Sequence, residues 1–188
     1  MTSDNRKQIG IGAVLALLIL ATHGHHYASA LHLPPATWAV FFLAGFYVRR
    51  AWVFTALLAE VVVLDYVATS IGGVSSFCVS PAYGFLLPAY GTLWLAGRWF
   101  AKRYSFSLKA LPALGASLLG SVTLAEMFSS GGFYFFSGHF ADTSLAEFGS
   151  RLVSYFPHTL ASFAFWMSIA IVVHASFALS QSGKQHHA

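Results

Sequence analysis

Charged residues are scarce in this chain of 188 residues. Asp, Glu, Lys and Arg make up 9% of it, whereas soluble domains carry about a quarter. Hydrophobic residues make up 57%, and the mean hydropathy is +0.67. No soluble fold could bury so large an apolar fraction. The composition therefore excludes an ordinary soluble domain and predicts an integral membrane protein.

Cysteine is nearly absent as well, since Cys78 is the only one. An intramolecular disulfide is therefore impossible, and thiol exchange would lack a resolving cysteine. The sequence also lacks the nucleophile elbow of α/β-hydrolases, the phosphate-binding loop of NTPases and the His-Glu-x-x-His helix of zinc peptidases. These absences disfavour a membrane enzyme or a thiol-redox protein. A transporter driven by ATP would need a separate ATPase chain.

Six apolar segments follow one another, and the longer ones match the roughly 20 residues that cross a bilayer. They span residues 9–22, 37–48, 51–71, 82–100, 108–128 and 152–179. The first two are short, and we expect them to extend into their flanks. We therefore predict a single domain over residues 1–188, an all-α integral membrane protein with a bundle of six transmembrane helices.

Basic residues set the orientation of these segments, because Lys and Arg near segment ends stay in the cytoplasm. Nine of the ten fall on one side of a six-helix bundle: Arg6, Lys7, Arg49, Arg50, Arg98, Lys102, Arg103, Lys109 and Lys184. Only Arg151 falls on the other. We predict both termini in the cytoplasm, and the net charge of +4 then reports topology and indicates no nucleic-acid partner. A signal peptide cleaved near residues 28–30 is the alternative, but it would leave an odd number of helices.

The connections on the outer side carry side chains that can bind a ligand, whereas the inner ones are basic turns. They hold four histidines in residues 23–37, Cys78 in residues 72–81, and aromatic residues after two glycines in residues 129–151. The histidines are His23, His25, His26 and His32, and the aromatic run is Phe133, Tyr134, Phe135 and Phe136. We expect this run to form a lid between glycine hinges, with His139 and His158 near the same pocket.

Three carboxylates lie inside apolar segments, where a charge is costly and marks a candidate functional residue. Asp65 stands about 9 Å below the outer end of its segment by helical rise, a depth that suits the floor of an outward-facing pocket. Glu60 and Glu126 fit a structural role, either protonated or bonded to a neighbouring helix.

The tetrapeptide Pro-Ala-Tyr-Gly occurs twice, at residues 81–84 and 88–91. The interval of seven residues places Tyr83 and Tyr90 on one face of a helix. We expect Gly84 and Gly91 to allow close packing between membrane helices.

Residues 76–84 read Ser-Phe-Cys-Val-Ser-Pro-Ala-Tyr-Gly. They follow the apolar segment that contains Asp65, and His26 lies in the first outer connection. In this pattern the chain resembles the BtuM-type vitamin B12 transporters. These are small bacterial membrane proteins related to the substrate-binding S-components of energy-coupling-factor transporters. The resemblance covers nearly the whole chain in size and topology. It implies an S-component-like bundle in the bacterial inner membrane that binds cobalamin on the periplasmic side.

By this resemblance, Cys78 is the axial ligand of the cobalt, and the vitamin binds base-off. A corrin already fills four equatorial positions, so a single soft donor is sufficient. The residues expected to line the pocket are His26, Asp65, Phe77, Tyr83, Tyr90, Phe133, Tyr134 and His158. A thiolate would also weaken the bond to the opposite axial group. Binding is therefore expected to promote loss of cyanide from cyanocobalamin.

Two questions stay open at the level of sequence. S-components that dock on an energising module of ATPases and scaffold carry Ala-x-x-x-Ala in their first helix, and this chain has Gly12 and Ala16 instead. It can therefore work with such a module or alone. The alternative functions are uptake of a bare nickel or cobalt ion through the histidines of the first connection, and uptake of another vitamin. Thr2 counts against the bare ion, because S-components for nickel and cobalt place a histidine there.

Overall fold

The computed structural model describes residues 3–23, 33–71 and 80–185, and they are almost entirely helical. The α-helices are α1 (Ser3–Thr22), α3 (Thr37–Tyr47), α4 (Ala51–Ser70), α5 (Leu86–Ala101), α6 (Leu111–Phe136) and α7 (Leu145–Gln185). Two short 3₁₀ helices, η2 (Pro81–Phe85) and η3 (Leu108–Ala110), precede α5 and α6. No strand occurs within these ranges, so the predicted all-α fold is confirmed.

In the part of the chain that the structure describes, three stretches are long and apolar enough to cross a membrane: Ala51–Ser70, Leu108–Phe136 and Leu145–Ser180. Most of their apolar side chains point outward, and only 11% of the most apolar part of α7 is buried within the protein. So much exposed apolar surface is costly in water and stable in lipid. The structure is therefore compatible with an all-α membrane protein.

The two short apolar segments behave differently from each other. α1 begins at Ser3, six residues before the predicted start, so the expected extension is confirmed for the first segment. It is wrong for the second, because α3 has only 11 residues. An α-helix of that length rises about 16 Å, roughly half of a hydrocarbon core about 30 Å thick. Pro34 and Pro35 favour extended backbone before α3, and Val48 is extended after it.

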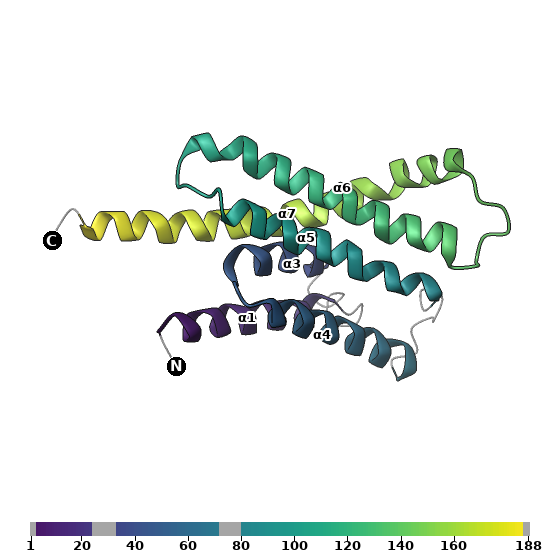
Figure 1. The fold of residues 1–188 in the computed structure, drawn as a ribbon, viewed down its shortest axis with the longest axis horizontal. Coiled ribbons are helices and arrows are strands. Elements are labelled where there is room, and N and C mark those ends of the chain that lie inside the picture. Colours follow the sequence, from purple (N-terminus) through teal and green to yellow (C-terminus); the bar gives the residue numbers. More distant parts are fainter. Residues whose placement is uncertain (1–2, 24–32, 72–79, 186–188) are drawn as a thin grey trace.

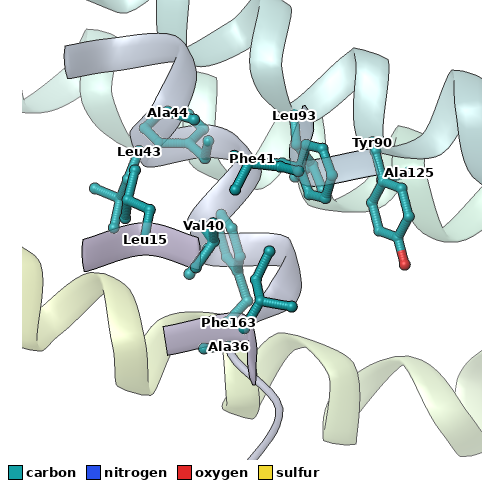
Figure 2. Close-up of a cluster of buried hydrophobic side chains, with 14 of the residues drawn as sticks. Leu15, Ala36, Val40, Phe41, Leu43, Ala44, Tyr90, Leu93, Ala125 and Phe163 are labelled. Carbon is teal, nitrogen blue, oxygen red and sulfur yellow. The ribbon is translucent and has the colours of Figure 1, made fainter. Parts of the chain in front are cut away.

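The short α3 forms the centre of the bundle, and 8 of its 11 residues are buried. A helix that is apolar on all sides needs neighbours on all sides. Figure 2 shows side chains from α1, α5, α6 and α7 around it, among them Leu15, Leu93 and Phe163. The ring of Phe41 on α3 stacks on Tyr90 of α5 with the ring centroids 4.3 Å apart.

Two glycines allow α3 and α5 to touch backbone to backbone. A Cβ atom on Gly45 would lie 2.0 Å from the carbonyl oxygen of Trp94, and one on Gly97 would lie 2.0 Å from that of Phe42. The expectation that Gly84 and Gly91 provide close helix packing is wrong, because a Cβ atom at either position meets nothing within 4 Å. Small residues do mediate packing here, but at other positions than the repeat suggested.

The two ends of the bundle differ in character. At one end, Arg50 donates to the Asn5 side chain at 2.8 Å, and Arg98 donates to the carbonyl oxygen of Arg49 at 2.8 Å. We call this the basic end; α1 begins there and α7 ends there (Figure 1). At the other end, α1 and α4 finish and η2 begins. We call it the Asp65 end.

Candidate functional site

Four side chains from four elements meet at the Asp65 end, and we call them the Asp65 cluster: His23, Thr37, Asp65 and Tyr83. The Nε2 atom of His23 lies 2.9 Å from Oδ1 of Asp65. The Tyr83 hydroxyl donates to Oδ2 of the same carboxylate at 2.6 Å. The other ring nitrogen of His23 lies 2.9 Å from the Thr37 hydroxyl. The cluster thus joins the end of α1, the start of α3, α4 and η2.

Local backbone bonds hold these groups in place. Thr22 donates its hydroxyl to the carbonyl oxygen of Leu18 and accepts from the backbone N–H of Ala36 at 3.1 Å. The end of α1 is therefore fixed beside the start of α3, which brings His23 next to Thr37. Pro81 is the first residue of η2, a position where its missing N–H costs no helical bond.

Hydrogen counting defines the roles within the cluster. An ionised carboxylate only accepts, so the Nε2 atom of His23 carries a hydrogen and donates to Asp65. In a neutral imidazole the other nitrogen then accepts from the Thr37 hydroxyl, and in a protonated one it donates. The His23 and Asp65 side chains are 14% and 33% exposed. Partial burial strengthens these charge-assisted bonds relative to surface pairs.

The Asp65 cluster offers an anionic hydrogen-bond acceptor. Its carboxylate is held in one orientation because His23 bonds to one oxygen and Tyr83 to the other. Such a group can receive an N–H or O–H donor from a ligand on its remaining lone pairs. Asp65 and Tyr83 were both expected to line one pocket, and the structure brings their side chains together. That they line a ligand pocket stays a prediction. His23 was considered only as one of several potential metal ligands. A carboxylate inside an apolar segment needs a hydrogen-bonding partner, and this need was the signal that could have identified His23 as the partner of Asp65.

Other predicted site residues lie outside this cluster. His26, Phe77 and Cys78 lie outside the residues that the structure describes. Tyr90 is 4% exposed and belongs to the core, where its ring is stacked on that of another residue. His158 is exposed on α7 and makes no side-chain hydrogen bond that reaches another described residue. Its predicted approach to the pocket stays a prediction.

The expected aromatic lid between glycine hinges is wrong. α6 continues to Phe136, so Phe133 and Tyr134 are helical and the connection to α7 covers only residues 137–144. The two glycines serve packing: a Cβ atom on Gly132 would lie 2.4 Å from the side chain of Phe85, and one on Gly131 would lie 3.4 Å from the ring of Phe148. Gly132 therefore allows η2 to approach α6 closely, whereas a Cβ atom on Gly131 would make an ordinary contact with α7.

Tyr134 instead stabilises the short connection between α6 and α7 by hydrogen bonds. It is 3% exposed, donates its hydroxyl to Glu147 at 3.2 Å and accepts from the backbone N–H of Ser144 at 3.0 Å. Arg151 donates to the same Glu147 carboxylate at 2.8 Å, and its guanidinium lies 4.6 Å from the centre of the Phe140 ring. Arg151, the one basic residue assigned to the outer side, is therefore paired.

The two remaining intrahelical carboxylates differ in burial. Glu126 is 4% exposed and accepts a short hydrogen bond from Ser130 one turn along α6, so the partner found lies on its own helix and not on a neighbouring one. Glu60 is half-buried on α4. Among residues 3–23, 33–71 and 80–185, no three or more His, Cys, Asp or Glu side chains form a group that could hold a metal ion.

No protein-family model matches the chain, and no curated protein matches it either.

Proposed function

We propose that this protein takes up cobalamin across the bacterial inner membrane. The corrinoid binds at the Asp65 end, with the Cys78 thiolate on cobalt and the vitamin base-off. The observation that carries the proposal is the bond between Asp65 and Tyr83, 18 residues apart in the chain. In the sequence, these two residues stand on either side of the segment that contains Cys78.

The chemistry of the ligand fits this arrangement. The corrin ring leaves only axial positions for the protein, and a thiolate is a soft donor suited to such a site. The rim of the corrin carries amide groups, which donate and accept hydrogen bonds. The Asp65 carboxylate offers an anionic acceptor for such an amide, and Tyr83 and His23 hold it in a fixed orientation. One soft axial donor and one oriented polar group could thus set both the position and the rotation of the corrinoid.

The proposed topology has six crossings with both termini in the cytoplasm. It is supported by Arg49 and Arg50, between α3 and α4, and by Arg98 on α5, which lie together at the basic end. Under the positive-inside rule this end faces the cytoplasm, and the Asp65 end then faces the periplasm. An energising module, if one is used, would dock from the membrane and the cytoplasm.

Uptake of a bare nickel or cobalt ion is the alternative. It would require several histidines of the first connection to converge on one ion. Both ring nitrogens of His23 already have partners in Asp65 and Thr37. His23 would have to give up these bonds to become a ligand, so this geometry favours cobalamin.

The test is the visible absorption spectrum of the purified protein after incubation with cyanocobalamin and removal of the free vitamin. We expect the wild type to retain a corrin spectrum that is shifted from the free form. Cys78→Ala should lose the shift, and Cys78→Ser, which keeps the size of the side chain without a soft donor, should lose it equally. The absence of corrin on the wild type would overturn the proposal.

A further inference from the structure

A cavity of about 460 Å³ lies at the basic end, between α3, α5, α6 and α7. Its volume falls within the roughly 300–1,000 Å³ of small-molecule sites. A cobalamin is several times larger than a ligand of that size, so this cavity is separate from the proposed corrinoid site. Most of the wall is apolar, with Phe42, Phe46, Phe106, Leu111, Met167 and Ile171 among its residues.

One polar group interrupts this apolar wall. The two ring nitrogens of His174 lie 2.7 Å from the Tyr47 hydroxyl and 2.6 Å from the Tyr104 hydroxyl, and all three residues line the cavity. A neutral imidazole donates through one nitrogen and accepts through the other, so one of the two phenol hydrogens remains unused. A protonated imidazole would leave both unused. The cavity therefore contains at least one O–H donor for a ligand.

The connection that walls the cavity is also basic. It runs from the end of α5 to η3, and Lys102, Arg103 and Lys109 belong to it or flank it. The ion pairs found within the described ranges involve only Asp65 and Glu147 as acids, so no carboxylate there neutralises these three side chains. Arg103 lies over the Trp99 ring, with its guanidinium carbon 4.1 Å from the centre.

We propose that this cavity binds an anionic phospholipid, with one acyl chain inside it and the phosphate at Lys102 and Lys109. The apolar wall fits the chain, the unused phenol hydrogen fits an ester oxygen, and the unpaired cations fit the phosphate. Basic pockets between membrane helices on the cytoplasmic side recognise anionic headgroups by this combination. The proposal does not depend on the identity of the ligand at the Asp65 end.

The test compares phosphatidylglycerol with phosphatidylcholine on the full-length protein in detergent, by native mass spectrometry. We expect one phosphatidylglycerol to be retained per chain, at least about tenfold more tightly than phosphatidylcholine, because each basic side chain near an anionic headgroup contributes to affinity. The double variant Lys102→Gln, Lys109→Gln should lose this preference. The control double variant Arg6→Gln, Lys7→Gln removes two exposed charges from α1 and should keep it.

A second pair of variants tests the place of the acyl chain. Ala170→Phe puts a ring into the cavity and should abolish retention, whereas Ala116→Phe, at an exposed position of α6 outside the cavity wall, should not. Equal retention of the two lipids, equal losses in both lysine and control variants, or lipid bound to a folded Ala170→Phe protein would each overturn the proposal. If Ala170→Phe does not fold, the exposed lysine variants still decide the outcome.

Discussion

Replacing Asp65 with asparagine perturbs the Asp65 cluster with almost no change in shape. The asparagine side chain exchanges one acceptor oxygen for an NH₂ group and removes the charge. The NH₂ group takes the place of one of the two acceptor oxygens, which are bonded to His23 and Tyr83, so that partner must change from donor to acceptor. The structure therefore predicts that both bonds lose the contribution of the charge and that one of them must also reverse its direction.

The size of the effect follows from the kind of bond. A hydrogen bond to a charged group contributes about 1.5–3 kcal/mol to stability. In a chain of about 150–250 residues, 1 kcal/mol moves the Tm by about 2–4 °C, so Asp65→Asn should lower the Tm by about 3–12 °C. The measurement is thermal unfolding of the detergent-solubilised protein at neutral pH, followed by tryptophan fluorescence.

Two further variants make this measurement specific. Tyr83→Phe removes only the hydroxyl, and its effect should add only in part to that of Asp65→Asn, because both variants perturb the bond between these two residues. Tyr66→Phe removes a hydroxyl from a neighbouring residue that is 67% exposed and should change stability by less than about 0.5 kcal/mol. An Asp65→Asn protein with the Tm of the wild type would show that the carboxylate is not held as described.

Three other variants test separate parts of the structure. Gly97→Ala should destabilise the protein by about 1–3 kcal/mol in thermal unfolding, because α3 and α5 must move apart, whereas Gly91→Ala should be neutral or stabilising by up to about 1 kcal/mol. Tyr134→Phe should speed limited proteolysis within residues 137–144, since it removes two bonds to that region, and Tyr155→Phe at a 62% exposed position should not. Cys78→Ala should abolish any protein-dependent loss of cyanide from cyanocobalamin, measured by the absorption spectrum; an undiminished rate would rule out a role for the thiolate.

The sequence was sufficient to predict the all-α fold and the approximate position of each helix, because apolar runs and basic turns are local signals. The ends of the helices were harder to predict. Gly131 and Gly132 look like hinges in a sequence, but in the structure they lie inside α6, where the Phe85 side chain of η2 occupies the space of the missing Cβ atom of Gly132. Which glycines lie at a contact depends on how the helices pack, and the local sequence does not contain that information.

The candidate site was predicted in part for the same reason. Asp65 is recognisable in the sequence because a carboxylate in an apolar segment is costly, and Tyr83 because it lies in the repeated Pro-Ala-Tyr-Gly motif after Cys78. His23 was not identified, because its bond spans 42 residues and depends on how α1 ends beside α3. Its membership in a histidine-rich stretch suggested metal binding, although its two nitrogens serve a carboxylate and a hydroxyl.

The short α3 explains why polar groups gather at two levels of the bundle. A helix that ends inside apolar surroundings must have its terminal N–H and C=O groups satisfied by the protein itself. At its start, Thr22 accepts from the N–H of Ala36, and Thr37 contacts the His23 ring. At its end, the carbonyl oxygen of Arg49 accepts from the Arg98 side chain, and the Tyr47 hydroxyl bonds to the His174 ring. α3 thus finishes at the basic end, and a helix of its length rises only about 16 Å, roughly half of a hydrocarbon core. Its start therefore lies deep within the bundle, which is where the Asp65 cluster forms.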